Sequence, residues 1–518
     1  MATAAHASPD LVIRPLLGLE RIMATVAIML ATIMQVLDST IANVALPHMQ
    51  TSLGATRESV SWVLTTYIFA TAVAMPITGW LSDRIGRKTL LVISVGAFTI
   101  ASVLCATATS LPQMVAFRLF QGLAGAFIAP LGQAVLLDIY PREDHAKAMT
   151  VFSMGVVLAP VLGPVLGGWL TENFNWRWVF LINLPIGLLC IPLLLRYMPR
   201  IPKMRRRFDL MGFALLAIAL GALQLMLDRG EQLDWFESWE TWFELGLAVS
   251  AGWMFLVHLF TDKDPIFEPR MFADRNFNAS LGFTFVLGLV VMAGSALLPT
   301  MLQGVLGHTV LHSGMLAMPR GLGVMIAMVI AGQLSGRVDD RVIIFLGTLM
   351  TAGSLWMMTQ FSLDMDSRPI IISGLIQGVG MGLIWMPVTM LGFATLAPQL
   401  RTSASSLLQL GRNIGGSIGI SMVVSLLAHN IQVSHSDLAA EVTPASAPPI
   451  DPSVLGMLGN RGEAVVAMLD AEINRQAAMI AYIDDYYLMM IMTLVTLPLI
   501  LLLRKPKVPP KDLPIVIE

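Results

Sequence analysis

The sequence predicts an all-α integral membrane protein, and three observations support this fold class. Of its 518 residues, 56% are hydrophobic and only 13% are charged, and the mean hydropathy is +0.73. In soluble domains, roughly a quarter of all residues are charged. The apolar residues are gathered in long runs, and motifs of the first half recur in the second half. The formal net charge of −2 gives no reason to expect a nucleic-acid partner.

Long apolar runs define the predicted spans, because a membrane-crossing helix needs about 20 predominantly apolar residues. Several runs contain glycine or proline, which membrane helices tolerate. One connection is long, namely the outward loop 430–481, whose proline-rich start precedes a helix-like stretch. The predicted spans are 22–46, 59–81, 89–109, 113–139, 147–170, 177–198, 210–228, 242–261, 278–303, 313–336, 342–361, 369–394, 403–429 and 482–503.

The distribution of lysine and arginine predicts the orientation. An even number of spans places both termini on one side of the membrane, and most basic residues fall on that side. Examples are Arg84, Arg87, Lys88 and the basic stretch from Arg200 to Arg207. The positive-inside rule therefore places both termini in the cytoplasm.

An internal repeat divides the chain into two halves. Gly79 to Arg84 (GWLSDR) closes the second span, and Gly332 to Arg337 (GQLSGR) closes the tenth. Parallel duplicated halves are typical of transporters, with the substrate site at mid-membrane between them. The expected domains are a cytoplasmic tail at 1–21, a six-helix bundle at 22–200, a basic loop with two inserted helices at 201–277, a second six-helix bundle at 278–503, and a cytoplasmic tail at 504–518.

Two charged residues inside the spans are functional candidates, because an ionised group in hydrocarbon is costly. Asp38 shares one face of the first span with Gln35, and Arg118 shares a stripe of the fourth span with Gln121. Counted at about 1.5 Å per residue, the two charges lie at comparable depth in the outer half of the membrane. A guanidinium that approaches or leaves a carboxylate can change the charge state of the acid. Two charged motif residues of the first half, Asp83 and Arg118, have no copies in the second half. Gly336 stands at the position that matches Asp83, and Gly374 stands at the position that matches Arg118.

Several motifs in the right order resemble the major facilitator superfamily, specifically its fourteen-helix drug:proton antiporter group and its EmrB-type pumps. The resemblance implies the major facilitator fold, with two six-helix bundles and two extra central helices. The motifs are LDSTIANVALP from Leu37 to Pro47, GWLSDRIGRK from Gly79 to Lys88, RLFQG from Arg118 to Gly122, GVVLAPVLGPVLGG from Gly155 to Gly168, NWRWVFLINLP from Asn175 to Pro185, and the stretch from Leu227 to Phe236.

The resemblance assigns roles to these motifs. It implies proton coupling by Asp38 and Arg118. Conformational gating falls to Gly79, Asp83, Arg84, Gly86, Arg87 and Lys88. The antiporter helix motif comprises Gly155, Pro160, Gly163, Pro164 and Gly167, whose glycines allow close helix contact. Apart from the resemblance, the embedded polar and charged residues of this sequence give the candidates for a substrate cavity, namely Gln35, Asn43, Gln121, Gln409, Arg412, Asn413 and Arg320.

The expected function is proton-driven multidrug efflux across the inner membrane of a bacterium, which confers antibiotic resistance. The expected partners are lipophilic small molecules, protons, membrane lipid, and a periplasmic adaptor with an outer-membrane channel, as in a tripartite pump. No enzyme activity, cofactor or metal is expected, because the sequence holds no HExxH motif, P-loop or Cys/His cluster.

Other interpretations stay open at this point. Asp38 and Arg118 can form a static structural pair. The basic residues after Gly79 can serve only to set the orientation of the chain in the membrane. Arg320 and Arg412 can pair with helix carbonyls or reach toward the surface. The chain can export one metabolite, fatty acid or siderophore by the same antiport mechanism, catalyse uptake, or act as a membrane sensor or scaffold. The loop 430–481 can lack a partner.

Overall fold

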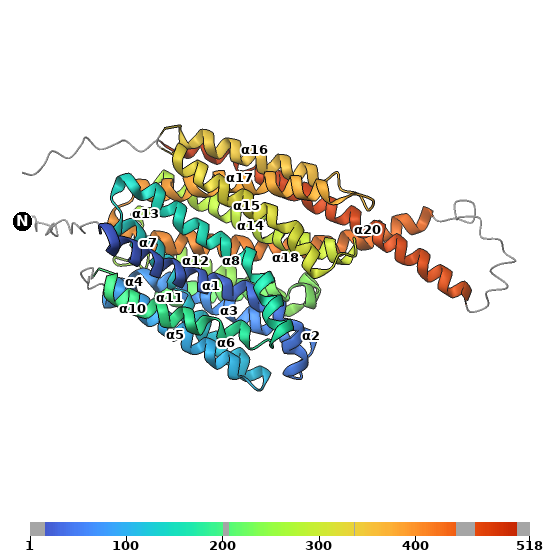
Figure 1. Cartoon of the computed structure of the whole chain (residues 1–518), viewed down its shortest axis with the longest axis horizontal. Helices are drawn as coiled ribbons and strands as arrows, with labels where there is room; N and C mark the ends of the chain where they lie inside the picture. Colours follow the sequence, from blue (N-terminus) through green and yellow to red (C-terminus); the bar gives the residue numbers. More distant parts are fainter. Residues whose placement is uncertain (1–15, 200–206, 336, 442–460, 505–518) are drawn as a thin grey trace, which may run out of the picture. The chain divides into compact units, whose positions relative to one another are not determined.

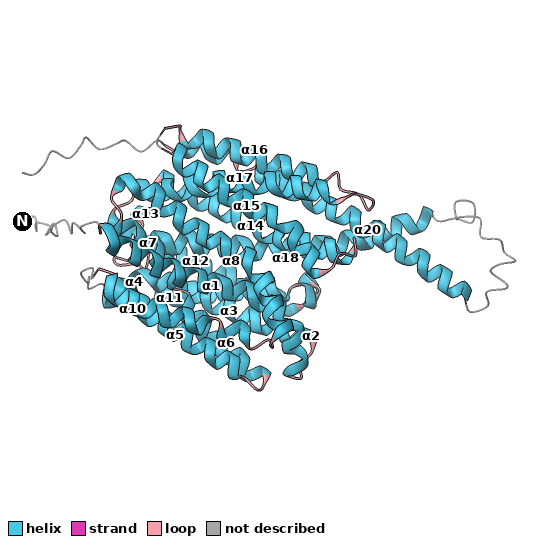
Figure 2. Ribbon diagram, viewed as in Figure 1, coloured by secondary structure: helices cyan, strands magenta, loops and turns pink. Residues whose placement is uncertain are grey.

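The structure is a computed structural model that describes residues 16–199, 207–335, 337–441 and 461–504 (Figure 1). Within these ranges every regular element is a helix (Figure 2). Thirteen of the described helices are long and apolar enough to cross a membrane, and the bent helix α8 (His145–Asn173) raises this number to 14. The predicted all-α membrane fold is confirmed.

The chain forms two compact units. The first comprises residues up to Ala217, together with Gly252–Met271 and Leu396–Leu407. Its described helices include α1 (Gly18–Ser52), α2 (Arg57–Val60), α3 (Trp62–Ala74), η1 (Met75–Ile77), α4 (Thr78–Ile85), α5 (Arg87–Thr107), α6 (Leu111–Gly125), α7 (Ile128–Ile139), η2 (Arg142–Asp144), α8, α9 (Trp178–Leu181) and α10 (Asn183–Tyr197).

The second unit comprises Ile218–Ala251, Phe272–Thr395 and the chain from Leu408 onward. Helices α11 (Leu210–Arg229), α12 (Trp239–Thr261) and α18 (Arg401–Glu441) each contribute residues to both units. The remaining elements are η3 (Glu231–Leu233), η4 (Trp235–Glu237), α13 (Arg270–Ala273), α14 (Arg275–Gly304), α15 (Val310–Leu334), α16 (Asp340–Met358), α17 (Ser367–Ala394), η5 (Pro398–Leu400), α20 (Arg461–Leu494) and η6 (Leu497–Leu502).

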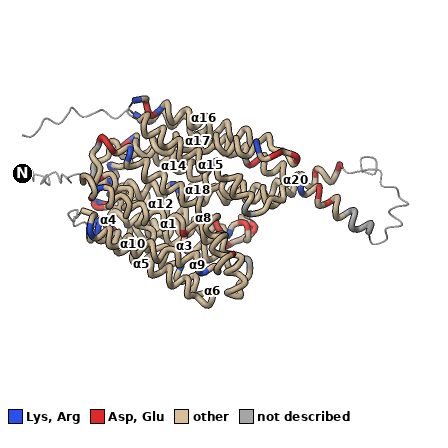
Figure 3. The backbone as a smooth tube through the Cα atoms, in the orientation of Figure 1, with Lys and Arg blue, Asp and Glu red and all other residues tan. Residues whose placement is uncertain are grey.

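Charged residues follow the pattern that a membrane requires. Figure 3 shows most lysine, arginine, aspartate and glutamate positions near helix ends, with long uncharged stretches between them. Asp38 and Arg118 are exceptions, because both lie within long apolar helices and have no exposed surface.

Helices α1 and α8 approach each other closely because glycines line the contact. A Cβ atom added at Gly163 would lie 2.3 Å from the Thr40 hydroxyl oxygen, and one at Gly167 would lie 2.9 Å from a carbon of Ile41. Small residues that allow backbones to approach are typical of membrane helix contacts. Gly155 extends the same contact toward Met29. The antiporter helix motif therefore packs directly against the helix that carries Asp38.

The bend of α8 coincides with its prolines. The two straight parts, His145–Pro160 and Val165–Asn173, meet at 42°. Proline removes a backbone hydrogen bond and its ring displaces the preceding turn, which explains a bend at this position. Pro160 is half-buried, whereas the side chain of Pro164 lies outside the described residues.

The segment 430–481, which the sequence suggests as one outward loop, is helical at both ends. Helix α18 continues to Glu441 and α20 starts at Arg461, so only the stretch between them lies outside the described residues. The reason is local, because residues 430–441 contain no glycine or proline that would end the helix. His435 and Asp470 join the two helices through a contact of 3.0 Å.

One helix contact recurs in the two halves. A Cβ atom added at Gly122 of α6 would lie 2.5 Å from the backbone oxygen of Tyr67 on α3. One added at Gly378 of α17 would lie 2.0 Å from the backbone oxygen of Arg320 on α15. Gln121-Gly122 and Gln377-Gly378 are matching pairs of the sequence repeat, so each half uses its glycine for the same close packing of its second and fourth spans.

Candidate functional site

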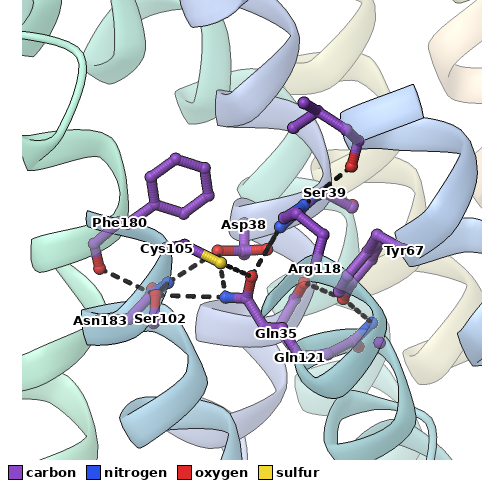
Figure 4. A network of polar contacts seen from close by, with 12 residues as sticks. Gln35, Asp38, Ser39, Tyr67, Ser102, Cys105, Arg118, Gln121, Phe180 and Asn183 are labelled. Carbon is purple, nitrogen blue, oxygen red and sulfur yellow. Dashed lines mark hydrogen bonds and ion pairs between the residues drawn. The ribbon is translucent and has the colours of Figure 1, made fainter. Parts of the chain in front are cut away.

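Asp38 lies at the centre of a buried hydrogen-bond network in the first unit (Figure 4). Its Oδ2 atom accepts a hydrogen bond from Nη1 of Arg118 at 2.6 Å. Its Oδ1 atom accepts from Nε2 of Gln121 and from Nδ2 of Asn183, each at 2.8 Å. Helices α1, α6 and α10 supply these side chains, and α5 adds Ser102 as a fourth contribution.

Arg118 is held by more than the carboxylate. Its Nε atom donates to the backbone oxygen of Val63 at 3.0 Å, and Nη1 also donates to Oε1 of Gln121 at 2.8 Å. Its guanidinium carbon lies 4.3 Å from the centre of the Tyr67 ring and 5.6 Å from that of Phe180. A cation over an aromatic face is stabilised by the ring quadrupole. The Nη2 atom has no hydrogen-bond partner among the described residues, so one donor of Arg118 is available to another ligand.

Ser102 of α5 binds both amide side chains of the network. Its hydroxyl accepts from the amide nitrogens of Gln121 and Asn183 at 3.1 and 2.8 Å, and it donates to the backbone oxygen of Phe180 at 2.9 Å. Both amides thus join Asp38 to Ser102. Cys105 donates to Oε1 of Gln121 at 3.5 Å. Each amide is fixed by two acceptors, so it points its donors at Asp38 without adjustment.

The electrostatics of this arrangement favour an ionised Asp38. Three donors face its two oxygens, one of them a guanidinium, and hydrogen bonds to a charged group are the strong ones. Burial opposes the charge, since desolvating an ion pair costs several kcal/mol per ion. The state of Asp38 therefore depends on whether Arg118 stays in place.

A second charged cluster lies near the GWLSDRIGRK motif. Asp138, 5% exposed at the end of α7, pairs with Arg87 of α5 and with Arg401 of α18, the latter at 3.1 Å. A Cβ atom added at Gly79 would lie 2.2 Å from the Ser403 hydroxyl oxygen, so α4 and the start of α18 are in close contact. All of these residues belong to the first unit.

The other residues of this motif have distinct positions. Gly86 separates α4 from α5 with a φ of 94°, a conformation that favours glycine. Lys88 donates to the backbone oxygens of Leu195 and Met198, both at 2.7 Å, which satisfies carbonyls at the end of α10. Arg84 is exposed and lies over the Trp80 ring, and Asp83 is half-buried.

The candidates of the second half lie in the second unit. Arg412 is half-buried, contacts Gln409, and lies 5.2 Å from the centre of the Trp385 ring. Arg320 donates to the backbone oxygen of Val291 at 3.3 Å. Neither arginine forms an ion pair with a carboxylate among the described residues. Asn413 is half-buried.

The structure brings some sequence-predicted residues together and separates others. Asp38, Arg118 and Gln121 share one network, and Gln35 joins its edge by donating to the Tyr67 hydroxyl at 3.3 Å. Asn43 is exposed on α1 and takes no part in it. Sequence reasoning did not single out Ser102 or Asn183, although Asn183 lies inside the NWRWVFLINLP motif, which was the available signal.

Comparison with known proteins shows the family to which the chain belongs. Residues 28–420 match the family profile described as "Major Facilitator Superfamily". The chain belongs to the major facilitator superfamily. The structure of a superfamily member, the proton:xylose symporter XylE, superimposes with a TM-score of 0.57 at 13% identity, covering 91% of this chain and 94% of that one, which supports the fold alone.

Two relatives specify the group within the superfamily. The chain is 36% identical over 439 residues to "Multidrug export protein EmrB" of Escherichia coli K12, covering 83% of this chain and 85% of the relative. It is 33% identical over 496 residues to "Fatty acid resistance protein FarB" of Neisseria gonorrhoeae, covering 95% and 98%. The predicted membership of the EmrB-type group of the superfamily is confirmed.

Proposed function

We propose that this chain exports lipophilic small molecules from a bacterial cell in exchange for protons, as a multi-pass inner-membrane protein with both termini in the cytoplasm. The observation that carries the proposal is the fully buried pair of Asp38 and Arg118 inside a membrane bundle. A relative of this chain, EmrB of Escherichia coli K12, is named a multidrug export protein. Two six-helix halves, joined through the inserted helices α11 and α12, are the proposed architecture.

The proposed cycle uses Asp38 as the proton carrier and Arg118 as its switch. When Asp38 binds a proton, its attraction for the guanidinium falls, and Arg118 keeps the Val63 carbonyl and the Tyr67 ring as partners. When the proton leaves, the amides of Gln121 and Asn183 again stabilise the carboxylate. The pair therefore has a reason to alternate between a closed and a loosened arrangement.

The cluster around Asp138 supports a gating role for the GWLSDRIGRK motif. Arg87 and Arg401 both bind the same buried carboxylate, and Gly79 admits the start of α18 at close range. We propose that these contacts hold one conformational state and separate in the other.

A separate role falls to the glycines of α8. They keep that helix tight against α1, which limits proton leakage beside Asp38.

Transport into proteoliposomes tests the proposed function. Purified full-length protein should drive accumulation of a lipophilic fluorescent dye when a pH gradient is imposed, and should dissipate that gradient when dye is added. Vesicles with protein that show neither response above empty vesicles would refute proton antiport. Dye-for-dye exchange without any pH response would identify a transporter of another class.

A second candidate substrate class is fatty acids and other anionic amphiphiles. The relative FarB is named for fatty acid resistance and matches almost the whole chain. Arg412 and Arg320 provide half-buried cations without carboxylate partners among the described residues. A cation above an aromatic ring, as at Arg412 and Trp385, suits a carboxylate with an apolar tail.

Replacing Arg412 with glutamine is expected to lower resistance to long-chain fatty acids about tenfold and to leave resistance to neutral dyes unchanged. A hydrogen bond to a charged group contributes about 1.5–3 kcal/mol, and about 1.4 kcal/mol corresponds to a factor of ten. Minimum inhibitory concentrations in a pump-deficient strain provide the measurement. Arg368→Gln is the control, because the Arg368 side chain is 87% exposed. Equal effects of both substitutions would remove Arg412 from the substrate site.

We propose that the outward ends of α18 and α20 bind a periplasmic adaptor, which in turn connects the protein to an outer-membrane channel. Figure 1 shows the end of α18 and the start of α20 extending beyond the other helices of their unit. The contact between His435 and Asp470 and the bond from Arg475 to the Val305 carbonyl fix this extension. Deletion of 435–475 is expected to abolish co-purification of an adaptor. Recovery of the adaptor with the shortened protein would exclude this docking role.

A further inference from the structure

Asp485 is a buried acid that the proposed cycle does not use. It lies on α20, in the second unit, and is 1% exposed. Neither carboxylate oxygen has a hydrogen-bond partner among the described residues. Asp38 is equally buried but accepts three hydrogen bonds. The two acids therefore sit in opposite environments.

The missing donors indicate which form of Asp485 this environment holds. An ionised carboxylate without a donor is among the most expensive groups to bury, and it neutralises by binding a proton. A protonated carboxyl carries no charge and fits the surroundings that the structure shows. We propose that Asp485 is a second proton-binding residue of this transporter, located in its C-terminal half and protonated in the conformation seen here.

The groups that face Asp485 leave it neutral. Helix α20 packs against α16 and α14. The titratable residues of these two helices, Arg275, Asp340 and Arg341, all lie at their starts. Tyr486 contacts Met301 near the other end of α14, roughly 39 Å from Arg275 at 1.5 Å per residue. On α20 itself the titratable neighbours are Asp484, Tyr482, Tyr486 and Tyr487, none of them a cation.

Arg320 supplies the counter-ion for the ionised form. Nη1 of Arg320 and Cε of Met489 lie 3.3 and 3.5 Å from the point where a Cβ of Gly294 would stand. Met489 is one turn from Asp485 on the same helix, and residues four apart share a helix face. The arginine and a side chain one turn from the acid therefore meet at the same point of α14, in the same unit. When Asp485 releases its proton to water, Arg320 can pair with the carboxylate.

The repeat explains why the arginine stands on α15. A Cβ atom added at Gly374, which replaces Arg118 in the second half, would lie 3.8 Å from Cβ of Arg320. Arg320 thus occupies the neighbourhood that a copied arginine would need. The first half pairs an acid of its first span with an arginine of its fourth. The second half offers an acid of its last span and an arginine of its second, so each half holds its own set of charges.

The test is infrared difference spectroscopy of the purified full-length protein titrated from acidic to alkaline pH. At pH 7 we expect a carbonyl stretching band of a protonated carboxyl, absent in Asp485→Asn and retained in Asp484→Asn. Asp484 is the matched control because it is the adjacent acid on the exposed side of α20. An unchanged band in Asp485→Asn, or no protonated carboxyl in the unmodified protein, would overturn the proposal.

A second variant keeps the proposal testable if Asp485→Asn does not fold. Arg320→Gln removes the counter-ion, so the carboxyl band should persist to higher pH, by at least one pH unit. An unshifted titration would contradict the role of Arg320 and Asp485. The inference rests on the proposed proton antiport, and the two fail separately. Dye transport driven by a pH gradient with no carboxyl band refutes only Asp485, whereas loss of that transport refutes antiport itself.

Discussion

Replacing Asp38 with asparagine is expected to reduce pH-gradient-driven dye transport to the level of empty vesicles while dye-for-dye exchange continues. Asparagine has nearly the shape of aspartate and still accepts a hydrogen bond, but it cannot bind and release a proton. The comparison of driven transport with exchange in the same proteoliposomes is the measurement. Driven transport at the unmodified rate would exclude Asp38 as the proton carrier.

A paired substitution separates this role from that of a static ion pair. Asp38→Asn leaves the buried guanidinium of Arg118 without a counter-charge, and loss of one partner of a buried pair destabilises by about 3–5 kcal/mol. Adding Arg118→Gln removes the unpaired charge, so the thermal unfolding midpoint should recover in the double variant. Proton coupling should stay absent. Recovery of coupling together with stability would show that the pair is structural.

Asp138→Asn is expected to lower the stability of the first unit by about 3–5 kcal/mol. The substitution leaves the guanidinium groups of Arg87 and Arg401, whose side chains are 7% and 11% exposed, around a neutral side chain. Thermal unfolding of the detergent-solubilised protein measures the effect, and transport should fall with it.

The control for this prediction is Asp144→Asn, another acid paired with two cations. The Asp144 side chain is 24% exposed, and its partner Lys147 is 78% exposed, so water replaces the lost interaction. We expect no measurable change in its unfolding midpoint. Equal midpoints for the two variants would mean that the cluster around Asp138 does not hold this unit together. Restoration by adding Arg401→Gln to Asp138→Asn would support the charge argument.

The fold could be predicted from the sequence because a membrane leaves few solutions. Apolar runs long enough to span give the helices, and charge asymmetry and repetition organise them. The exact ends could not be predicted in the same way. Helix α18 continues to Glu441 beyond its apolar part, where hydropathy no longer signals a helix but nothing in the sequence stops one.

The site could be predicted only where a residue carries charge. Asp38 and Arg118 stand out in apolar runs, and helix rise gives their depth. Asn183 and Ser102 do not, because neutral polar residues are common in membrane helices and only the fold shows that both point at one carboxylate. Asp485 falls near the start of the predicted span 482–503, where an acid suggests a membrane surface, whereas the longer α20 buries it.

The central claim is that Asp38 exchanges a proton when substrate binds. Proton release on substrate addition, followed with a pH-sensitive dye in weakly buffered detergent solution, tests it most directly. Starting from acidic solution, where Asp38 carries a proton and its hold on Arg118 is loosened, the unmodified protein should release protons on binding a lipophilic dye, and Asp38→Asn should bind the same dye with a smaller release. Equal proton release from both proteins at equal dye occupancy would contradict the account.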